Sequence, residues 1–431
     1  MRVLRPLVTC CCLMLVLAAC QTSNPLALPT ETPPPPTATL QATATPTPLP
    51  GSAAGFDHLL AQAEARRPDQ RQDLVNRYIG QLVQTPVTGG DEAIFLYRGA
   101  AQVVQVHGDM NDWDVEQAPA MTRLDGTDLW YWRANFEPDA RLDYQFVVDG
   151  RPVGLDPLNP DTIPSPGGPN SELRMPAYQP PAELAPPSEP IPSGTVTSHT
   201  LDSQHLGQTR TFLIYEPPGQ IVGQPLPSLY VNGGTDYLNL IDAPAILDSL
   251  IAQRQIPPLL TVFIAPINAD QEHALNDAYA DFLAEELAPY VQERFDANAD
   301  PATTGIIGND LGGLAAVHAA VNHADVFGLA AAQSGRFGYD MEALIQDVGR
   351  RRAGQAGYVP PRVYLVAGAY ETAVEVGNGP ENILEANRQL AAAIEQAGFD
   401  HRLDERPEGH SWGLWRGSLG RALSYLFSPG S

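Results

Sequence analysis

The chain has 431 residues, 43% of them hydrophobic and 17% charged, so it is long enough for two folded domains with extensions. Its 25 basic and 50 acidic residues give a formal net charge of −25, which argues against nucleic acid and anionic membrane surfaces as partners. The sequence has no P-loop, HExxH or EF-hand motif, so we expect no cofactor and no metal at the functional site. All four cysteines lie within the first 20 residues, which excludes disulfides and cysteine metal sites from the folded part.

The N-terminus has the layout of a secretory signal, because two arginines precede an apolar run at 8–17 that is too short to span a bilayer comfortably. The run ends in Leu17-Ala18-Ala19-Cys20, which resembles the lipobox of bacterial lipoproteins. The resemblance implies removal of residues 1–19, lipidation of Cys20, and an extracytoplasmic protein anchored to a membrane by its acyl chains. The alternative is an ordinary signal peptide with an incidental cysteine.

Two proline-rich stretches divide the rest of the chain. Residues 20–55 comprise Cys20 and a tether in which proline and threonine dominate without hydrophobic periodicity. Residues 178–194 form a shorter proline-rich linker, which marks a domain boundary. We therefore expect one folded domain at 56–177 and a second at 195–431.

The first domain is expected to begin with helices and continue as a small β-sandwich. Apolar residues recur at three-to-four spacing between Phe56 and Leu82, which predicts a helical lead-in packed against the next part of the chain. Short β-rich runs then alternate with Gly, Asp, Asn and Pro turns, as is typical of a sandwich. These runs cover 93–98, 103–107, 129–133 and 142–148.

Several motifs in this region resemble the early-set immunoglobulin-like module found ahead of glycogen-branching enzymes. They are Gly108-Asp109-Met110-Asn111-Asp112-Trp113, Leu129-Trp130, Val148-Asp149-Gly150 and Asp156-Pro157. Some relatives of that module stack sugars on exposed aromatic residues, which makes Trp113 and Trp130 candidate carbohydrate-binding residues. The alternative is that both tryptophans belong to the sandwich core and its corners.

The second domain alternates strands and helices, which is the signature of a doubly wound α/β sheet. The pattern predicts strands at 210–215, 227–231, 260–264, 303–307, 328–332 and 362–366. It predicts helices at 243–252, 278–294, 311–322, 381–396 and 412–427.

Within this domain, residues 305–320 read as a buried strand, a glycine-framed turn and a helix of small residues. The turn Gly308-Asn309-Asp310-Leu311-Gly312 resembles the Gly-x-Ser-x-Gly nucleophile elbow of α/β-hydrolases, whose strained turn lifts one side chain above the sheet. Asp310 stands where that motif has serine. The fold expected from the whole chain is an α/β-hydrolase sheet preceded by an all-β immunoglobulin-like sandwich.

The other parts of a hydrolase site have candidates in the required chain order. Gly233 and Gly234 follow the second predicted strand, where their amides could form an oxyanion hole with that of Leu311, unless they make a plain turn. Glu371 follows the strand ending at 366, where the catalytic acid of this fold lies. The alternative is that Glu371 is a surface glutamate that caps the next helix, in which case Glu375 or Glu381 would be the catalytic acid.

His410 completes the candidate site, because it lies between a glycine and a tryptophan-bearing helix start near the C-terminus. The other histidines, including His273 and His323, are expected to be structural or solvent-exposed.

Together these motifs resemble the esterase D and enterochelin esterase group. The resemblance rests on Gly409-His410-Ser411-Trp412-Gly413-Leu414-Trp415-Arg416, on Phe327-Gly-Leu-Ala-Ala-Ala-Gln-Ser-Gly335 and on the preceding β-module, and it spans roughly residues 90–428. It implies an esterase acting on small or siderophore- or carbohydrate-linked esters, without a cofactor. The family has the same Gln-Ser-Gly as a structural element, which implies that Ser334 is structural and is not the missing nucleophile. Asp310 departs from the family pattern, and so does Asn232, where members often have histidine.

Asp310 changes the chemistry that the site supports. Attack of a carboxylate on an ester carbonyl would give a mixed anhydride uphill of the substrate, whereas haloalkane dehalogenases and epoxide hydrolases use a similar Gly-x-Asp-x-Gly turn against other substrates. This leaves two hypotheses: an active hydrolase with Asp310 as nucleophile or base and Glu371 and His410 as relay partners, or a pseudoenzyme that binds without turnover. The sequence specifies no oligomeric state.

Overall fold

The computed structural model describes residues 48–220, 223–351, 354–377 and 379–428. The predicted signal peptide, Cys20 and most of the proline-rich tether lie outside these residues. Among the described residues, none of the helices combines the length and the apolar character needed to cross a membrane.

A helical lead-in covers one face of the first β-sheet, as the sequence predicts. Helices α1 (Ala53–Glu64) and α2 (Arg71–Ile79) pack on a sheet whose strand order is β1-β2-β5-β4. These strands are β1 (Val87–Gly89), β2 (Glu92–Arg98), β5 (Leu129–Asn135) and β4 (Thr122–Arg123). Because side chains alternate along β2, Ile94 and Leu96 face the helices, while Ala93 and Phe95 face the sandwich core. Both faces of β2 are therefore buried.

A second antiparallel sheet closes this core in the order β3-β6-β9-β8, with β7 paired to β6. Its strands are β3 (Val104–Gly108), β6 (Arg141–Val148), β7 (Arg151–Gly154), β8 (Thr162–Ile163) and β9 (Asn170–Arg174). Trp130 lies in the shared core, 6% exposed, and its indole donates to the carbonyl of Gly99 at 3.1 Å. The prediction that Trp130 displays its ring for sugar stacking is therefore wrong, because the ring is part of the sandwich core.

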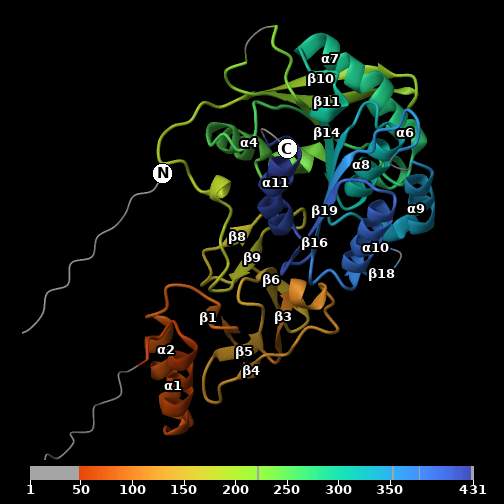
Figure 1. Cartoon of the computed structure of the whole chain (residues 1–431). Coiled ribbons are helices and arrows are strands. Elements are labelled where there is room, and N and C mark those ends of the chain that lie inside the picture. The colour runs from red at the N-terminus through yellow and green to blue at the C-terminus, as the bar shows by residue number, and fades with distance from the viewer. Residues whose placement is uncertain (1–47, 221–222, 352–353, 378, 429–431) are drawn as a thin grey trace, which may run out of the picture. The chain divides into compact units, whose positions relative to one another are not determined.

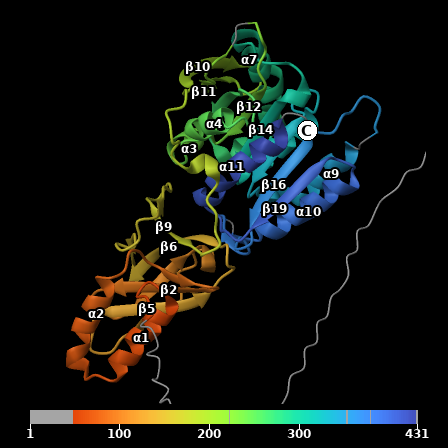
Figure 2. The same ribbon diagram turned by 60° about the vertical axis from the view of Figure 1, so that its left-hand side comes forward.

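The second region is an eight-stranded sheet with the order β10-β11-β13-β12-β14-β15-β16-β19 (Figures 1 and 2). The strands are β10 (Thr195–Ser203), β11 (Gln208–Glu216), β12 (Ser228–Asn232), β13 (Leu260–Ile264), β14 (Thr304–Asn309), β15 (Leu329–Gln333), β16 (Arg362–Gly368) and β19 (His401–Arg406). All neighbours from β13 to β19 are parallel, whereas β11 runs antiparallel to both of its neighbours. The order reverses between β12 and β14, which opens a crevice at the carboxyl ends of the strands.

Helices cover both faces of this sheet. The apolar cluster on one face includes α4 (Ala243–Ala252) and α11 (Trp412–Phe427). The cluster on the other includes α6 (Asp277–Asp281), α7 (Ala288–Phe295), α8 (Leu311–Asn322), α9 (Met341–Arg350) and α10 (Ile383–Gln396). Every residue of α8 except Asn322 is buried, because its glycines and alanines let it lie close to the sheet.

The helix predicted at 278–294 is interrupted by a π-helical segment, Phe282–Leu287, between α6 and α7. Pro289 accounts for the interruption, because it has no N–H to give to the carbonyl four residues earlier. Smaller elements complete the region: α3 (Gly234–Asn239), α5 (Ala269–Glu272), and a hairpin of β17 (Val374–Glu375) with β18 (Pro380–Glu381).

Candidate active site

The turn between β14 and α8 has the geometry of a nucleophile elbow. Asp310 lies at its apex with φ 50° and ψ −125°, a backbone conformation that non-glycine residues rarely adopt. A Cβ atom on Gly308 would lie 2.3 Å from the carbonyl carbon of Gly312, so the turn requires glycine there. The amide of Asp310 donates to the carbonyl of Gln333 at 3.0 Å, which ties the apex to β15.

The Asp310 side chain carries a carboxylate oxygen that is unpartnered among the described residues. Its Oδ1 atom is buried and has no hydrogen-bond partner among the described residues. It borders a pocket of about 370 Å³ that Gly233, Leu311 and His273 also line. A buried polar atom without a partner costs about 1–3 kcal/mol, so the carboxylate is poised to accept a hydrogen bond from a molecule in the pocket.

Of the three predicted oxyanion residues, Gly233 and Leu311 line the same pocket and Gly234 does not. Gly233 has φ 77° between β12 and α3, and a Cβ on Gly234 would lie 2.5 Å from the amide nitrogen of Ile264. Within the described part of the chain, the amides of Gly233 and Leu311 have no hydrogen-bond acceptor. Both N–H groups are therefore available to a developing negative charge, while Gly234 contributes by letting the turn pack against β13.

Asn232, the second departure from the family pattern, braces the elbow. It is fully buried, its amide nitrogen donates to the carbonyl of Gly312 at 3.2 Å, and its side-chain oxygen accepts from the Tyr279 hydroxyl at 3.0 Å. Asn232 thus holds the end of β12 against the first turn of α8.

Glu371 and His410 are joined, as the sequence predicts. The Oε1 atom of the fully buried Glu371 lies 2.7 Å from Nδ1 of His410, and its Oε2 accepts from the amide of Gly368 at 2.7 Å. Of the substitutes, Glu381 pairs with Arg336 at 3.0 Å and Glu375 is exposed on β17. Glu371 is therefore the acid that meets the histidine.

The environment of His410 favours its protonated form. Since a carboxylate can only accept, Nδ1 donates to Glu371, which leaves Nε2 for a substrate or water. Burial opposes a charge on the ring, whose side chain is 18% exposed, but the Glu371 hydrogen bond and charge, with the charges of Asp310 and Asp109, outweigh it and raise the pKa of His410.

Two residues that the sequence predicts to be structural also meet the site. Ser334 is indeed structural, because it is fully buried and its hydroxyl accepts from the Trp415 indole at 2.9 Å. His273, in contrast, lines the Asp310 pocket. Burial, with the charge of Arg210, lowers the pKa of His273 to about 4, and its buried Nε2 has no partner among the described residues. A neutral imidazole therefore faces the pocket.

The β-sandwich contacts the loop between β19 and α11, which bears His410 and is called the histidine loop below, through Asp109. A Cβ on Gly409 would lie 2.2 Å from the Asp109 carboxyl carbon, so Asp109 packs directly beside His410. The carboxylate accepts from the Trp113 indole at 2.8 Å and from the Asp143 amide at 2.7 Å. Burial, followed by the nearby Asp143 charge, raises the pKa of Asp109 to about 8.

Arg141, on strand β6 of the sandwich, is buried and forms hydrogen bonds with the histidine loop. Its backbone amide donates to the carbonyl of Pro407 at 3.1 Å, and its buried guanidinium donates to the Ser411 hydroxyl at 3.3 Å. The guanidinium also pairs with Glu172 at 2.5 Å and Glu408 at 3.6 Å. Burial outweighs the nearby arginine charges and raises the pKa of Glu408 to about 7.

A second pocket, of about 460 Å³, is the one that His410 itself lines. It is lined by Trp113, by the loop Ser165–Gly168 and by Trp412 and Trp415. Trp113 is half-buried there with φ 58°, so it remains a candidate ligand contact, whereas Trp130 does not.

The sheet order, the elbow and the Glu371–His410 pair define an α/β-hydrolase-like protein. The Esterase family model, described as "Putative esterase", matches residues 203–426, more than half of the chain, and the model "Enterochelin esterase, N-terminal" matches residues 92–155. The chain therefore belongs to this esterase family and is similar to enterochelin esterases in both regions.

Relatives span nearly the same architecture. The chain is 25% identical over 404 residues to the iron(III) enterobactin esterase of Dickeya dadantii, covering 80% of this chain and 90% of the relative. It is 26% identical over 351 residues to that of Escherichia coli K12, covering 73% and 83%. The crystal structure of a ferric enterobactin esterase from Salmonella typhimurium superposes with a TM-score of 0.65 at 22% identity, covering 78% and 93%, which supports the fold.

Proposed function

We propose that this protein hydrolyses small carboxylic esters outside the cytoplasm, using Asp310 as a general base rather than as a covalent nucleophile. The observation that carries the proposal is the 2.7 Å contact between His410 and Glu371, because a histidine relay is retained beside an elbow that lacks serine. The unpartnered oxygen of Asp310 supplies a base at the neighbouring pocket, and Asp310 lies close enough to His410 for its charge to help raise the pKa of the imidazole.

The proposed reaction attaches no part of the substrate covalently to the protein, and every proton removed is returned. Asp310 accepts a proton from a water molecule as its oxygen attacks the ester carbonyl, and the amides of Gly233 and Leu311 stabilise the oxyanion. Protonated His410 gives its Nε2 proton to the departing alkoxide as the carbon–oxygen bond breaks. The proton on Asp310 then returns to His410, so water and ester yield acid and alcohol. A mixed anhydride on Asp310 is avoided.

The charge of the pocket favours neutral or cationic esters. Asp236 and Asp270 line the pocket together with Asp310, and burial raises the pKa of Asp236. The guanidinium of Arg336, which also lines the pocket, is engaged by Glu381 and by the carbonyl of Val376 at 3.2 Å. The family also suggests siderophore-linked and carbohydrate-linked esters as candidate substrates, so assays should include them beside simple esters.

The decisive experiment is turnover of p-nitrophenyl and feruloyl esters in H₂¹⁸O. The general-base route places ¹⁸O in the product acid and none in the protein. A covalent route in which water attacks the Asp310 carbonyl of the anhydride labels the Asp310 carboxylate, which peptide mass spectrometry detects. Label in Asp310 would overturn the general-base assignment.

The second candidate is a catalytically silent binding protein. One observation favours it: no hydrogen bond joins the Asp310 carboxylate to His410 within the described residues, so the resting site has no direct proton path between them. Hydrolysis no faster than background, and unchanged by His410→Ala, would establish this function instead.

The location is also a proposal. The lipobox-like Leu17-Ala18-Ala19-Cys20 supports an extracytoplasmic protein anchored through lipidated Cys20. Incorporation of labelled palmitate in a bacterial host, lost in Cys20→Ala, tests the anchor. Secretion without label would leave an ordinary signal peptide.

A further inference from the structure

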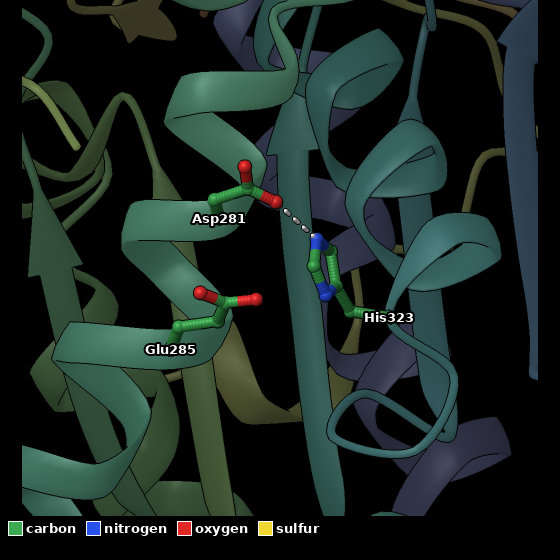
Figure 3. Close-up of side chains that lie close together, drawn as sticks. All are labelled: Asp281, Glu285 and His323. Atoms are coloured by element: carbon green, nitrogen blue, oxygen red, sulfur yellow. Dashed lines mark ion pairs between the residues drawn. The ribbon is translucent and has the colours of Figure 1, made fainter.

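A cluster of metal-ligand side chains lies apart from the active site, at the far end of α8. It consists of Asp281, Glu285 and His323, and one ligand atom of each lies within 4.8 Å of the others (Figure 3). Asp281 ends α6, Glu285 lies one turn later in the π-helical segment, and His323 caps the C-terminus of α8. Because α8 has 12 residues, about 18 Å of helix separates His323 from Asp310.

The geometry of this cluster is close to that of a metal site. Nε2 of His323 lies 3.0 Å from Oδ1 of Asp281. Ligands bound tetrahedrally at about 2.0–2.1 Å from a zinc ion lie about 3.3 Å apart, so the His323–Asp281 pair has nearly the required spacing, and the ligand atom of Glu285 lies within 4.8 Å of both. The side chains of Asp281 and Glu285 are 36% and 58% exposed, which leaves an entry path and room for a water ligand.

A second imidazole reaches the same carboxylates. His205, in the turn between β10 and β11, places Nε2 3.1 Å from Oε2 of Glu285 and Nδ1 4.0 Å from Oδ2 of Asp281. The turn is anchored because the Glu286 carboxylate accepts from the amides of Gln204 at 2.8 Å and of His205 at 3.3 Å. Such a partner orients a ligating carboxylate from outside the coordination shell.

We propose that Asp281, Glu285 and His323 bind a zinc ion, with water completing the coordination and His205 holding Glu285 in place. Nitrogen and oxygen ligands suit zinc, and the two carboxylates balance its charge. The carbonyl end of α8 adds favourable negative potential beside His323. The zinc site does not depend on the proposed ester hydrolysis.

The competing explanation is a pair of histidine–carboxylate ion pairs without a metal. Neighbouring groups already pair in this way, since Nε2 of His318 lies 3.1 Å from Asp277. Exposed ion pairs of this kind contribute little to stability and require no metal. The two explanations differ in one measurable respect, which is the affinity of the protein for zinc.

The test is titration of the purified protein with zinc chloride by calorimetry, with bound metal counted by mass spectrometry after dialysis. We expect one zinc ion per chain and a higher midpoint of thermal unfolding when zinc is present. His323→Ala should weaken binding by about 100-fold or more, and His205→Ala by about 10-fold, because His205 only orients a ligand. The matched control is His58→Ala, which removes an exposed histidine of α1 outside the cluster and should leave binding unchanged.

Cobalt substitution identifies the ligand atoms. With nitrogen and oxygen ligands alone, the cobalt-bound protein should give only weak visible bands. An intense thiolate charge-transfer band would show that the N-terminal cysteines bind the metal instead. Absence of zinc binding, or binding that His323→Ala leaves unchanged, would overturn the proposal. Circular dichroism of His323→Ala confirms that the variant is folded, and Asp310→Asn should leave zinc affinity unchanged.

Discussion

The two halves of the candidate active site are built very differently. On the β16–β19 side, Glu371 and His410 are bound to each other, and Glu371 is also bound to the amide of Gly368. On the β14 side, the backbone of Asp310 is fixed while its Oδ1 has no partner among the described residues. The relay half is therefore complete, and at the apex of the elbow the difference from a serine esterase is the Asp310 side chain on an intact turn.

Restoring serine should give the largest effect. Asp310→Ser puts a hydroxyl on a turn that already has the elbow geometry, so kcat/KM for p-nitrophenyl acetate should rise by about 10³-fold as covalent catalysis becomes available. Stopped-flow or steady-state assays measure the change. The double variant Asp310→Ser/His410→Ala is the control and should lose the gain. No gain in the single variant would mean that the relay does not reach the elbow.

Removing the histidine from the parent protein should have the next largest effect. His410→Ala removes the proposed general acid, so kcat should fall by about 100-fold. Because the pKa of His410 is raised, the protonated acid persists above its usual titration range, and parent activity should fall as pH rises through that pKa. In Glu371→Gln the stabilising charge is lost, so this fall should move to lower pH. An unchanged pH profile in Glu371→Gln would contradict the relay.

The buried carboxyl groups where the histidine loop meets the sandwich, Glu408 and Asp109, should make the free energy of unfolding depend on pH. The folded-state pKa values of Glu408 and Asp109, about 7 and about 8, lie above the unfolded values, so the folded state retains these protons between about pH 4.5 and 8. Stability from these groups is therefore present at low pH and lost as pH rises through that window.

Glu408→Gln tests this because it keeps the neutral form at every pH. Relative to the parent, thermal or urea unfolding should show a gain of about 1–3 kcal/mol at pH 8 and little change at pH 5. The exposed Glu375→Gln is the control and should show no such pH dependence. A variant that is equally destabilised at both pH values would instead show that Arg141 requires the Glu408 charge.

Substrate charge should have the smallest effect. Among p-nitrophenyl esters with matched acyl chains, a cationic trimethylammonio ester should exceed an anionic succinate ester by about 10-fold in kcat/KM at low salt, because carboxylates line the pocket. Added salt should narrow the ratio, and Asp270→Asn should narrow it by about twofold. A preference for the anionic ester would refute the charge argument.

Much of the fold could be predicted because its signals are local. The helices at 243–252, 311–322 and 412–427 and the strand at 260–264 agree with the structure at both ends. Buried parallel strands are short apolar runs bounded by turn residues, and the elbow needs its glycines at fixed spacing. For the same reason Asp310, Glu371 and His410 could be assigned from their places after β14, β16 and β19.

The rest depends on contacts between distant segments. Nothing near Arg141 in the sequence indicates that its partner is Glu408, and His273 gives no sign that it borders the Asp310 pocket. The charges of Arg141 and Asp143, two residues apart on one strand face, are the one local hint of a buried network. The sugar-stacking alternative fails for Trp130 because the exposure of an aromatic ring is set by the opposite sheet.

The contact between Arg141 and the start of α11 limits how the two regions of this protein can be recombined. A Cβ on Gly413 would lie 1.8 Å from the Arg141 guanidinium, so the arginine of one region occupies space that a side chain of the other would need. Recombination that joined this hydrolase region to a different N-terminal partner would leave Glu408 without its buried cation and the loop bearing His410 without its backing. In this chain the two regions should therefore be engineered together, with Arg141 and Gly413 changed as a pair.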